Sequence, residues 1–526
     1  MKILVTDPIS EEGLNILKQE KDVDVDIKLN PPAEELKKII ADYDAWILRS
    51  GTKVTKDIID AAVKLRVIGR AGVGLDNVDS EAATKRGIIV MNTPGGNTIS
   101  TAEHTMSMML ALSRNIPQAD ASLRSGRWER KKFTGVELFG KTLGIIGLGR
   151  IGREVAKRAL SFNMRVVAYD PFLSKERTSK LEIESIDLEE LLQISDYITT
   201  HTPLTQDTKH LISQTAFKMM KKGVKIVNCA RGGIVDEKAL YEAIKEGIVS
   251  GAALDVFEKE PPNDNCLLKL ENVIVTPHLG ASTEEAQINV SVEVCRQVVD
   301  ALVGRCVRNA VNFPCLEPEV FKVIGPYLNL AEKLGLLQAQ LLAGRITRVD
   351  IKYCGDIINH DLAVLTIAII KGLLAPILQE TVNFVNAPVI AKERRIEIVE
   401  SKTSEVEDFA NLISIDVSTD RGKNSVVGTL FTRNDPRIVK INEFYIDAVP
   451  SGYMLVIANI DKPGIVGKIG TFLGDNNINI AGMNFGRQSP GGKAITVLNI
   501  DSPLTEEMLS QVKSMPHIHD AKIVKL

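Results

Sequence analysis

A glycine-rich turn between an apolar run and an amphipathic segment limits what this 526-residue chain can fold into more than any other feature. Residues 143–146 suit a buried parallel strand, and apolar side chains recur at helical spacing after the turn. Gly147 permits the tight bend, Gly149 leaves room for a pyrophosphate, and Gly152 lets the helix pack closely on the strand. The phosphates would then lie at the helix N-terminus.

An acidic residue at the end of the next apolar run supports a dinucleotide site. Asp170 follows Gly152 by 18 residues, where a carboxylate would accept both ribose hydroxyls of an adenosine. No arginine follows directly to bind a 2′-phosphate, because the next residues are Pro171 and Phe172. The pattern predicts NAD rather than NADP, although a glycine-rich turn in another α/β protein would share the local sequence.

Length and charge exclude several classes of protein. A chain of 526 residues implies several domains, and a net charge of −3 without a basic block argues against nucleic acid as a partner. An acidic residue at position 7 comes too early for a secretory signal, and the apolar segment 362–378 is interrupted by Lys371, Gly372 and Pro376, which predicts a core helix. The six cysteines have no metal-ligand spacing and are expected to be reduced. We expect a cytoplasmic protein without a metal site or a membrane partner.

Residues 1–98 alternate strands with helices, which implies parallel βα units. Two loops, 48–53 and the glycine-rich 70–77, come where apolar strands should end. Ligands of such folds bind beyond the carboxyl ends of strands, so Arg49, Ser50 and the glycine-rich loop are candidates for holding an anion. The alternative for Arg49 is a solvated surface side chain.

A long amphipathic helix is expected from Ser100 to about Arg114, directly before the dinucleotide unit. Such a helix could carry the chain from one domain into the next. His104 lies inside it, and we interpret this histidine as a packing residue.

Three side chains suited to acid–base or charge chemistry follow later apolar strands. Arg231 comes first, and Glu260 and His278 follow it at spacings of 29 and 18 residues. Oxidation of a secondary alcohol needs a base for the hydroxyl proton, which histidine supplies at neutral pH when a carboxylate fixes its tautomer. An arginine can bind the substrate carboxylate through its planar fork. Each residue could instead be structural, but together they predict a hydroxy-acid dehydrogenase.

The order of these motifs resembles the D-isomer-specific 2-hydroxyacid dehydrogenases, and within that family the long-form phosphoglycerate dehydrogenases of serine biosynthesis. The resemblance covers essentially the whole chain and rests on the segments 48–54, 69–79, 91–94, 147–152, 228–233, 255–261 and 277–280, on Asp170 and on the C-terminal extension. It implies NAD-dependent oxidation of 3-phospho-D-glycerate to 3-phosphohydroxypyruvate by a homotetramer.

The resemblance also implies a division into domains and a set of site residues. Two Rossmann-like, doubly wound parallel-sheet domains are expected, a discontinuous substrate-binding domain (1–98 with 285–310) and an NAD-binding domain (99–284). Arg231 would orient the substrate, His278 would be the acid/base, and Glu260 would be its partner. The expected substrate contacts are Arg49, Ser50, Gly72, Val73 and Asn97. The expected NAD contacts are Gly147, Gly149, Arg150, Ile151, Gly152, Asp170, Thr202, Cys229, Ala230, Arg231, Asp255, His278, Gly280 and Ala281. At Val73 some relatives carry threonine, so one hydroxyl contact would be absent.

The C-terminal half follows a polar, proline-ended linker at residues 309–314. Residues 315–450 contain no catalytic constellation, and the resemblance implies an α+β intervening regulatory domain there. Residues 451–526 predict the strand and helix order βαββαβ of a ferredoxin-like fold. This last segment resembles an ACT domain, a module that pairs across subunits and binds amino acids.

The resemblance places effector contacts at Asn459, Asp461 and Asn479. L-serine is the expected effector, since it is the end product of the pathway. Asp461 could cap the first helix of the module and also receive the amino group of the effector.

Two other functions remain open from the sequence. One is a dehydrogenase or reductase of another D-2-hydroxy acid, such as glyoxylate or hydroxypyruvate, which an amino-acid-sensing tail argues against. The other is a corepressor-like module that uses the fold for NAD(H)-dependent interaction, which the intact Arg231, Glu260 and His278 argue against. Activity on a panel of 2-hydroxy acids would separate all three.

Overall fold

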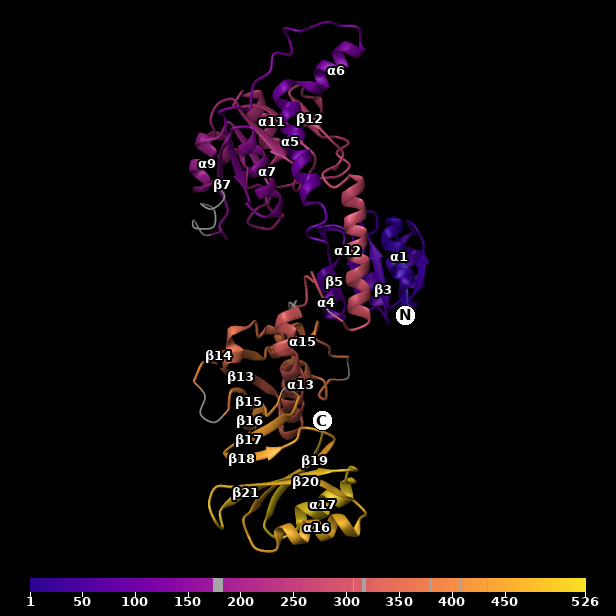
Figure 1. Ribbon diagram of the computed structural model, residues 1–526, viewed down its shortest axis with the longest axis vertical. Coiled ribbons are helices and arrows are strands. Elements are labelled where there is room, and N and C mark those ends of the chain that lie inside the picture. The colour runs from indigo at the N-terminus through magenta and orange to yellow at the C-terminus, as the bar shows by residue number, and fades with distance from the viewer. Residues whose placement is uncertain (174–182, 306, 315–317, 379–380, 406–408, 433) are drawn as a thin grey trace.

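Four β-sheets follow one another along the molecule, which is elongated (Figure 1). In Figure 1 the NAD-type sheet lies at the top, the N-terminal sheet lies below it, and the two C-terminal sheets lie at the bottom. The computed structural model describes residues 1–173, 183–305, 307–314, 318–378, 381–405, 409–432 and 434–526.

The N-terminal sheet has five parallel strands in the order β2-β1-β3-β4-β5. Every side chain of β3 is buried, as expected for a parallel strand covered by helices on both faces. The elements are β1 (Lys2–Val5), α1 (Glu11–Gln19), β2 (Asp24–Ile27), α2 (Ala33–Ile39), η1 (Ile40–Asp42), β3 (Ala45–Leu48), α3 (Lys56–Ala61), β4 (Val67–Arg70), α4 (Ser80–Lys85) and β5 (Ile89–Met91). The distant helix α12 (Glu284–Leu302) packs against α1 and β4. A Cβ on Gly69 would lie 2.5 Å from Cγ2 of Val298, so this helix approaches the sheet closely.

The second sheet has seven parallel strands in the order β12-β11-β10-β9-β6-β7-β8. Its elements are α5 (Thr98–Arg114), α6 (Ile116–Arg124), β6 (Thr142–Ile146), α7 (Arg150–Ser161), β7 (Arg165–Tyr169), β8 (Glu184–Ser185), α9 (Leu188–Ile194), β9 (Tyr197–Thr200), α10 (Gln214–Met219), β10 (Val224–Asn228), α11 (Glu237–Lys245), β11 (Val249–Leu254), η2 (Cys266–Lys269) and β12 (Val273–Val275). The direction of strand succession reverses between β6 and β9. Ligands of doubly wound sheets bind at such a switch point, which places a site at these two carboxyl ends.

The third sheet is mixed, with β13 and β14 parallel and the remaining pairs antiparallel, in the order β14-β13-β15-β16-β17-β18. Its elements are α13 (Pro318–Leu341), β13 (Ile346–Gly355), η3 (Asp356–Asn359), α14 (Ala363–Leu374), α15 (Ala387–Glu393), β14 (Glu397–Thr403), β15 (Asn411–Thr419), β16 (Gly422–Leu430), β17 (Pro436–Ile441) and β18 (Phe444–Ala448).

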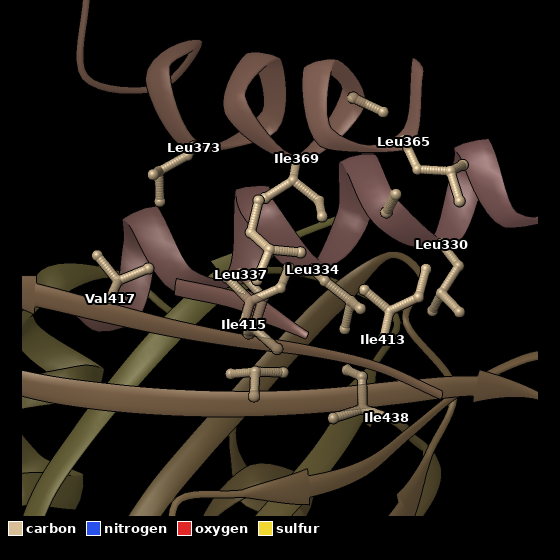
Figure 2. Packing of buried hydrophobic residues seen from close by; sticks show 14 of the residues in the cluster. Leu330, Leu334, Leu337, Leu365, Ile369, Leu373, Ile413, Ile415, Val417 and Ile438 are labelled. Carbon is tan, nitrogen blue, oxygen red and sulfur yellow. The ribbon is translucent and has the colours of Figure 1, made fainter. Parts of the chain in front are cut away.

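Figure 2 shows α13 lying between α14 and this sheet, with Leu334 and Leu337 directed toward Ile413, Ile415 and Ile438. The two helices touch at glycines. A Cβ on Gly335 would lie 2.1 Å from the carbonyl oxygen of Ile369, and α14 ends at Leu374 rather than reaching residue 378. The expected core helix is therefore present but shorter than predicted.

The C-terminal sheet is antiparallel in the order β20-β21-β19-β22, and the chain order is the predicted βαββαβ. Its elements are β19 (Tyr453–Ile460), α16 (Ile465–Asp475), β20 (Ile480–Arg487), β21 (Lys493–Ile500), α17 (Glu506–Ser514) and β22 (Ile518–Lys525). Alternation along β19 sends Leu455 and Ile457 under the two helices, and Met454 and Val456 into the core of the preceding domain. The third and fourth sheets therefore share one hydrophobic core.

These four sheets confirm the predicted class, two Rossmann-like α/β units followed by an α+β unit and a ferredoxin-like unit. Cys229, Cys266, Cys295 and Cys354 are free thiols, and Cys306 and Cys315 lie outside the described residues. Within the described ranges, no helix combines the length and apolar character that crossing a membrane requires.

Candidate active site

A cleft of about 860 Å³ lies between residues carried by the first two sheets. The N-terminal sheet contributes the loops that follow β3 and β4, and the second sheet contributes the segments that follow β10, β11 and β12. All five expected substrate residues and all three expected catalytic residues line it, namely Arg49, Ser50, Gly72, Val73, Asn97, Arg231, Glu260 and His278.

His278 and Glu260 form an ion pair, with 2.8 Å between Nδ1 of the histidine and Oε2 of the carboxylate. The other carboxylate oxygen of Glu260 accepts the backbone N–H of Phe257 at 3.1 Å. A carboxylate on Nδ1 keeps the proton there, which leaves Nε2 of the imidazole to exchange a proton with a substrate. The pair can therefore act as an oriented acid/base.

The buried carboxylate of Asp255 shapes the turn that carries His278. It accepts the backbone N–H groups of Leu279 and Gly280 at 2.7 and 2.8 Å and the hydroxyl of Thr276 at 2.6 Å. Burial alone would raise the pKa of Asp255, but hydrogen bonds led by that from His104 bring it below its ordinary value. His104 does not line the cleft. It contacts Asp255 from α5 with Nε2 3.2 Å from Oδ1.

Arg231 is held by a turn that Asn228 stabilises. The Asn228 side chain accepts the backbone N–H of Ala230 and the hydroxyl of Thr200, and it donates to the carbonyl oxygen of Arg231 at 2.9 Å. The guanidinium faces the glycine-rich loop, where a Cβ on Gly74 would lie 2.4 Å from its Nη2. The side chain is thus fixed at the edge of the cleft.

Arg70, which the sequence reasoning did not select, lies beside Arg231 in the same cleft. Burial, followed by repulsion from Arg231, lowers the pKa of Arg70 to about 10. In the part of the chain that the structure describes, its buried Nε has no hydrogen-bond partner. A Cβ on Gly72 would lie 2.2 Å from Arg70 Nη1, so the loop closes over this guanidinium. Lys53 is a further missed cation that lines the cleft.

A signal for Arg70 was available in the sequence. Arg70 ends the buried strand β4, just as Arg231 follows the buried strand β10. A charged side chain in such a position is costly without an anion. The same argument that selected Arg231 therefore applies to Arg70.

The expected NAD residues gather at the carboxyl edge of the second sheet, where β6, β7, β9, β10, β11 and β12 end. Gly147 has φ +93°, and a Cβ on it would lie 2.7 Å from Thr202 Cγ2. A Cβ on Gly152 would lie 2.2 Å from the carbonyl oxygen of Gly147, whereas a Cβ on Gly149 would meet nothing within 4 Å. The first and third glycines are therefore required by packing, and the second leaves open space for a ligand.

Two further observations fit a dinucleotide at this edge. Asp170 accepts the backbone N–H groups of Leu148 and Phe172 at 2.9 Å each, which places its carboxylate beside the glycine turn. The hydroxyl of Thr202 is buried without a partner in the described ranges and could bond a ligand. Burial raises the pKa of Cys229 to about 12, so this residue stays a thiol.

The three expected effector residues do not meet within one chain. Asp461 accepts from Arg487 at 2.9 Å and from the backbone of Gly491, beside a pocket of about 510 Å³. Asn479 lies at the opposite end of β20, bonded to Asp501, and Asn459 is buried and bonded to Thr496.

Asp461 does not cap the following helix, contrary to the expectation. The N-cap of α16 is Gly464, with φ +90° and no side-chain hydrogen bond. The hydrogen bond from Arg487 lowers the pKa of Asp461, so this carboxylate is held by an arginine rather than by helix N–H groups.

Three family models match separate parts of the chain. Residues 106–280 match the NAD-binding domain of the D-isomer-specific 2-hydroxyacid dehydrogenases. Residues 323–442 match the intervening domain of D-3-phosphoglycerate dehydrogenase, and residues 453–517 match the ACT domain. NAD is therefore the cofactor of the second sheet, as predicted.

Solved structures resemble the dehydrogenase part. A D-lactate dehydrogenase from Aquifex aeolicus, complexed with NAD and lactic acid, is 29% identical and matches 58% of this chain and 96% of its own with a TM-score of 0.53. A protein from Thermus thermophilus is 36% identical and matches 59% of this chain and all of its own with a TM-score of 0.55.

Curated relatives match the full length. D-3-phosphoglycerate dehydrogenases from Methanocaldococcus jannaschii and Archaeoglobus fulgidus are 49% and 48% identical over 100% of both chains. The Bacillus subtilis enzyme is 45% identical over 100% of this chain and 99% of its own. With the acid/base pair, the NAD edge and all three domain types present, this chain belongs to the D-3-phosphoglycerate dehydrogenases, within the family of D-isomer-specific 2-hydroxyacid dehydrogenases.

Proposed function

We propose that the cleft oxidises 3-phospho-D-glycerate at its C2 hydroxyl, with His278 as the acid/base and Glu260 as its orienting partner. NAD, when bound, supplies the acceptor for the hydride from C2. His278 Nε2 takes the hydroxyl proton, and the 2.8 Å contact of Nδ1 with Glu260 stabilises the resulting imidazolium. Arg231 pairs with the substrate carboxylate and holds C2 in place.

The observation that carries this choice of substrate is the buried, unpartnered Arg70 Nε beside Arg231, in the part of the chain that the structure describes. Arg49, Lys53 and Arg70 add three cations to the cleft beyond the one that a simple 2-hydroxy acid needs. A phosphate monoester carries a charge of about −1.5 to −2 at neutral pH and offers three acceptor oxygens. These three side chains are therefore proposed to bind the 3-phosphate.

The alternative of a glyoxylate or hydroxypyruvate reductase is not supported. Those substrates carry no phosphate, so they would leave Arg70 buried without an anion. The full-length relatives are named D-3-phosphoglycerate dehydrogenases.

NADH formation from a panel of acids tests the proposal. 3-Phospho-D-glycerate should be oxidised with kcat/KM at least about 100-fold above that of D-glycerate, since several charge-assisted bonds are lost with the phosphate. D-lactate serves as a second substrate without a phosphate. Equal kcat/KM for phosphorylated and unphosphorylated substrates would overturn the assignment.

We further propose that residues 1–98 with 285–310, 99–284, 315–450 and 451–526 form the four domains. The packing of α12 against α1 and β4 supports the return of the chain to the first domain, and α5 supports the boundary near residue 98 because it packs on α7 and β11. A cytoplasmic location is proposed as well, in keeping with a biosynthetic role.

L-serine is the proposed effector, bound between ACT domains of two subunits. Asp461 and Asn479 lie at opposite ends of β20, so one amino acid can touch both only if a second copy supplies one of them. A homotetramer is proposed as the assembly. The segment after α6 supports subunit contacts because it exposes Trp128 at 77% and Phe139 at 68% of their surface.

A further inference from the structure

The loop that carries Glu260 is fastened at both ends by a single side chain. This loop runs from Glu258 to Asn265 between β11 and η2. Oε1 of Glu237 accepts the backbone N–H of Glu258 at 2.6 Å, and Oε2 of Glu237 accepts the side-chain amide of Asn265 at 2.6 Å. One carboxylate thus bridges the first and last residues of the loop.

Glu237 is not needed to cap its own helix. It is the first residue of α11, where the N-cap Asp236 already accepts the backbone N–H groups of Lys238 and Ala239 at 3.0 Å each. Burial raises the pKa of Glu237, and the neighbouring carboxylates of Glu258 and Asp236 act in the same direction. A half-buried carboxylate among other carboxylates is costly, and here its two oxygens serve only the loop.

The position of Glu260 depends on this loop. Glu260 is the second residue after the anchored Glu258 N–H, and its carboxylate must reach His278 Nδ1 at 2.8 Å. The start of the loop is also pressed against the turn of Arg231, since a Cβ on Gly232 would lie 1.8 Å from the carbonyl oxygen of Phe257. Small displacements of this loop therefore act on the acid/base pair first.

We propose that Glu237 is a positioning residue for the reaction, which holds the Glu258–Asn265 loop so that Glu260 stays paired with His278. The proposal rests on the proposed function, namely on the roles of Glu260 and His278. Glu237 does not line the cleft, so it acts through Glu260 rather than on the substrate.

The test compares Glu237→Ala with Glu237→Gln in the full-length protein. Glu237→Ala should lower kcat roughly tenfold with little change in the KM for NAD, because a displaced catalytic group costs rate rather than cofactor affinity. It should also displace the acidic limb of the pH profile of kcat in the same direction as Glu260→Gln. Glu237→Gln keeps one acceptor, for the Glu258 N–H, but turns an amide nitrogen toward Asn265, so its kcat should be intermediate.

Two controls separate positioning from general stability. Glu242→Ala removes an exposed carboxylate from the same helix and should behave as the unaltered protein. In a double-mutant cycle, adding Glu237→Ala to Glu260→Gln should cost little further activity, because both changes break the same contact.

The outcomes distinguish this inference from the proposed function. If Glu260→Gln alone leaves kcat and the pH profile unchanged, the proposed acid/base pair is wrong. If Glu260→Gln impairs the enzyme while Glu237→Ala keeps a normal kcat and pH profile, or if the two changes multiply fully, Glu237 has no positioning role.

Discussion

The catalytic cleft and the ACT pocket of this chain differ in how much of each site one chain supplies. The cleft brings its acid/base pair, its arginines and its NAD edge together from segments up to about 230 residues apart, all within one fold. The ACT pocket has Asp461 and Arg487 at one end of β20 and leaves Asn479 at the other. Chemistry can therefore be complete in one chain, whereas effector sensing depends on how chains assemble.

The largest expected effect separates the two sites. His278→Ala should lower kcat by roughly 100-fold or more, because the oriented acid/base is lost, while NADH affinity stays nearly unchanged. Serine binding to the same variant, measured by calorimetry, should match that of the unaltered protein. Near-normal turnover by His278→Ala would remove the histidine from the reaction.

Arg70→Ala should raise the KM for 3-phospho-D-glycerate by about 10- to 100-fold, the cost of losing a charge-assisted contact to phosphate. The KM for D-glycerate should change far less, because that substrate offers no phosphate. Arg66→Ala, which removes an exposed arginine just before the other end of β4, is the matched control. A uniform loss on both substrates would mean that Arg70 supports the fold of the cleft instead.

Serine inhibition tests the division between chains directly. Asp461→Ala and Asn479→Ala should each abolish inhibition with little loss of uninhibited activity, and Asp475→Ala on α16 should retain it. In mixed oligomers of the two variants, half of the pairings regain one intact site, so inhibition should partly return. If the mixed oligomers stay insensitive while the unaltered protein is inhibited, the site does not span two chains.

The smallest expected change concerns cofactor choice at the edge of the cleft. Asp170→Ala should narrow the preference for NAD over NADP by roughly tenfold, mainly by weakening NAD, because the ribose hydroxyls lose a charged acceptor. Steady-state KM values for both cofactors provide the measurement. Equal use of NAD and NADP by the unaltered protein would contradict the role of Asp170.

Local patterns were enough for the fold class. The glycine turn, the alternation of strands and helices, and the βαββαβ order each depend on side chains a few positions apart, and all were confirmed. The helix α6 was not predicted. It is separated from α5 only by Asn115 in a left-handed conformation with φ +52°, which a periodicity argument does not detect.

The site was harder to predict where a residue's role depends on distant neighbours. Arg70 was missed because its meaning comes from the nearby Arg231, about 160 residues later in the chain. Asp461 was given a capping role because it precedes a helix, but Arg487, on a strand 26 residues further on, takes its carboxylate. Spacing in sequence identifies candidate groups, whereas their partners emerge only from the packed structure.

The face of β19 that carries Met454 and Val456 has a practical consequence for dissecting the protein. Cutting the chain at residue 450, where the sequence motifs suggest a boundary, would strip an apolar sheet face from α13 and expose it to solvent. Such a truncated protein would be prone to aggregate, and its loss of activity would say nothing about regulation. The severable unit is the whole region from the linker at residues 309–314 onward, so a serine-insensitive dehydrogenase is better made by ending the chain there.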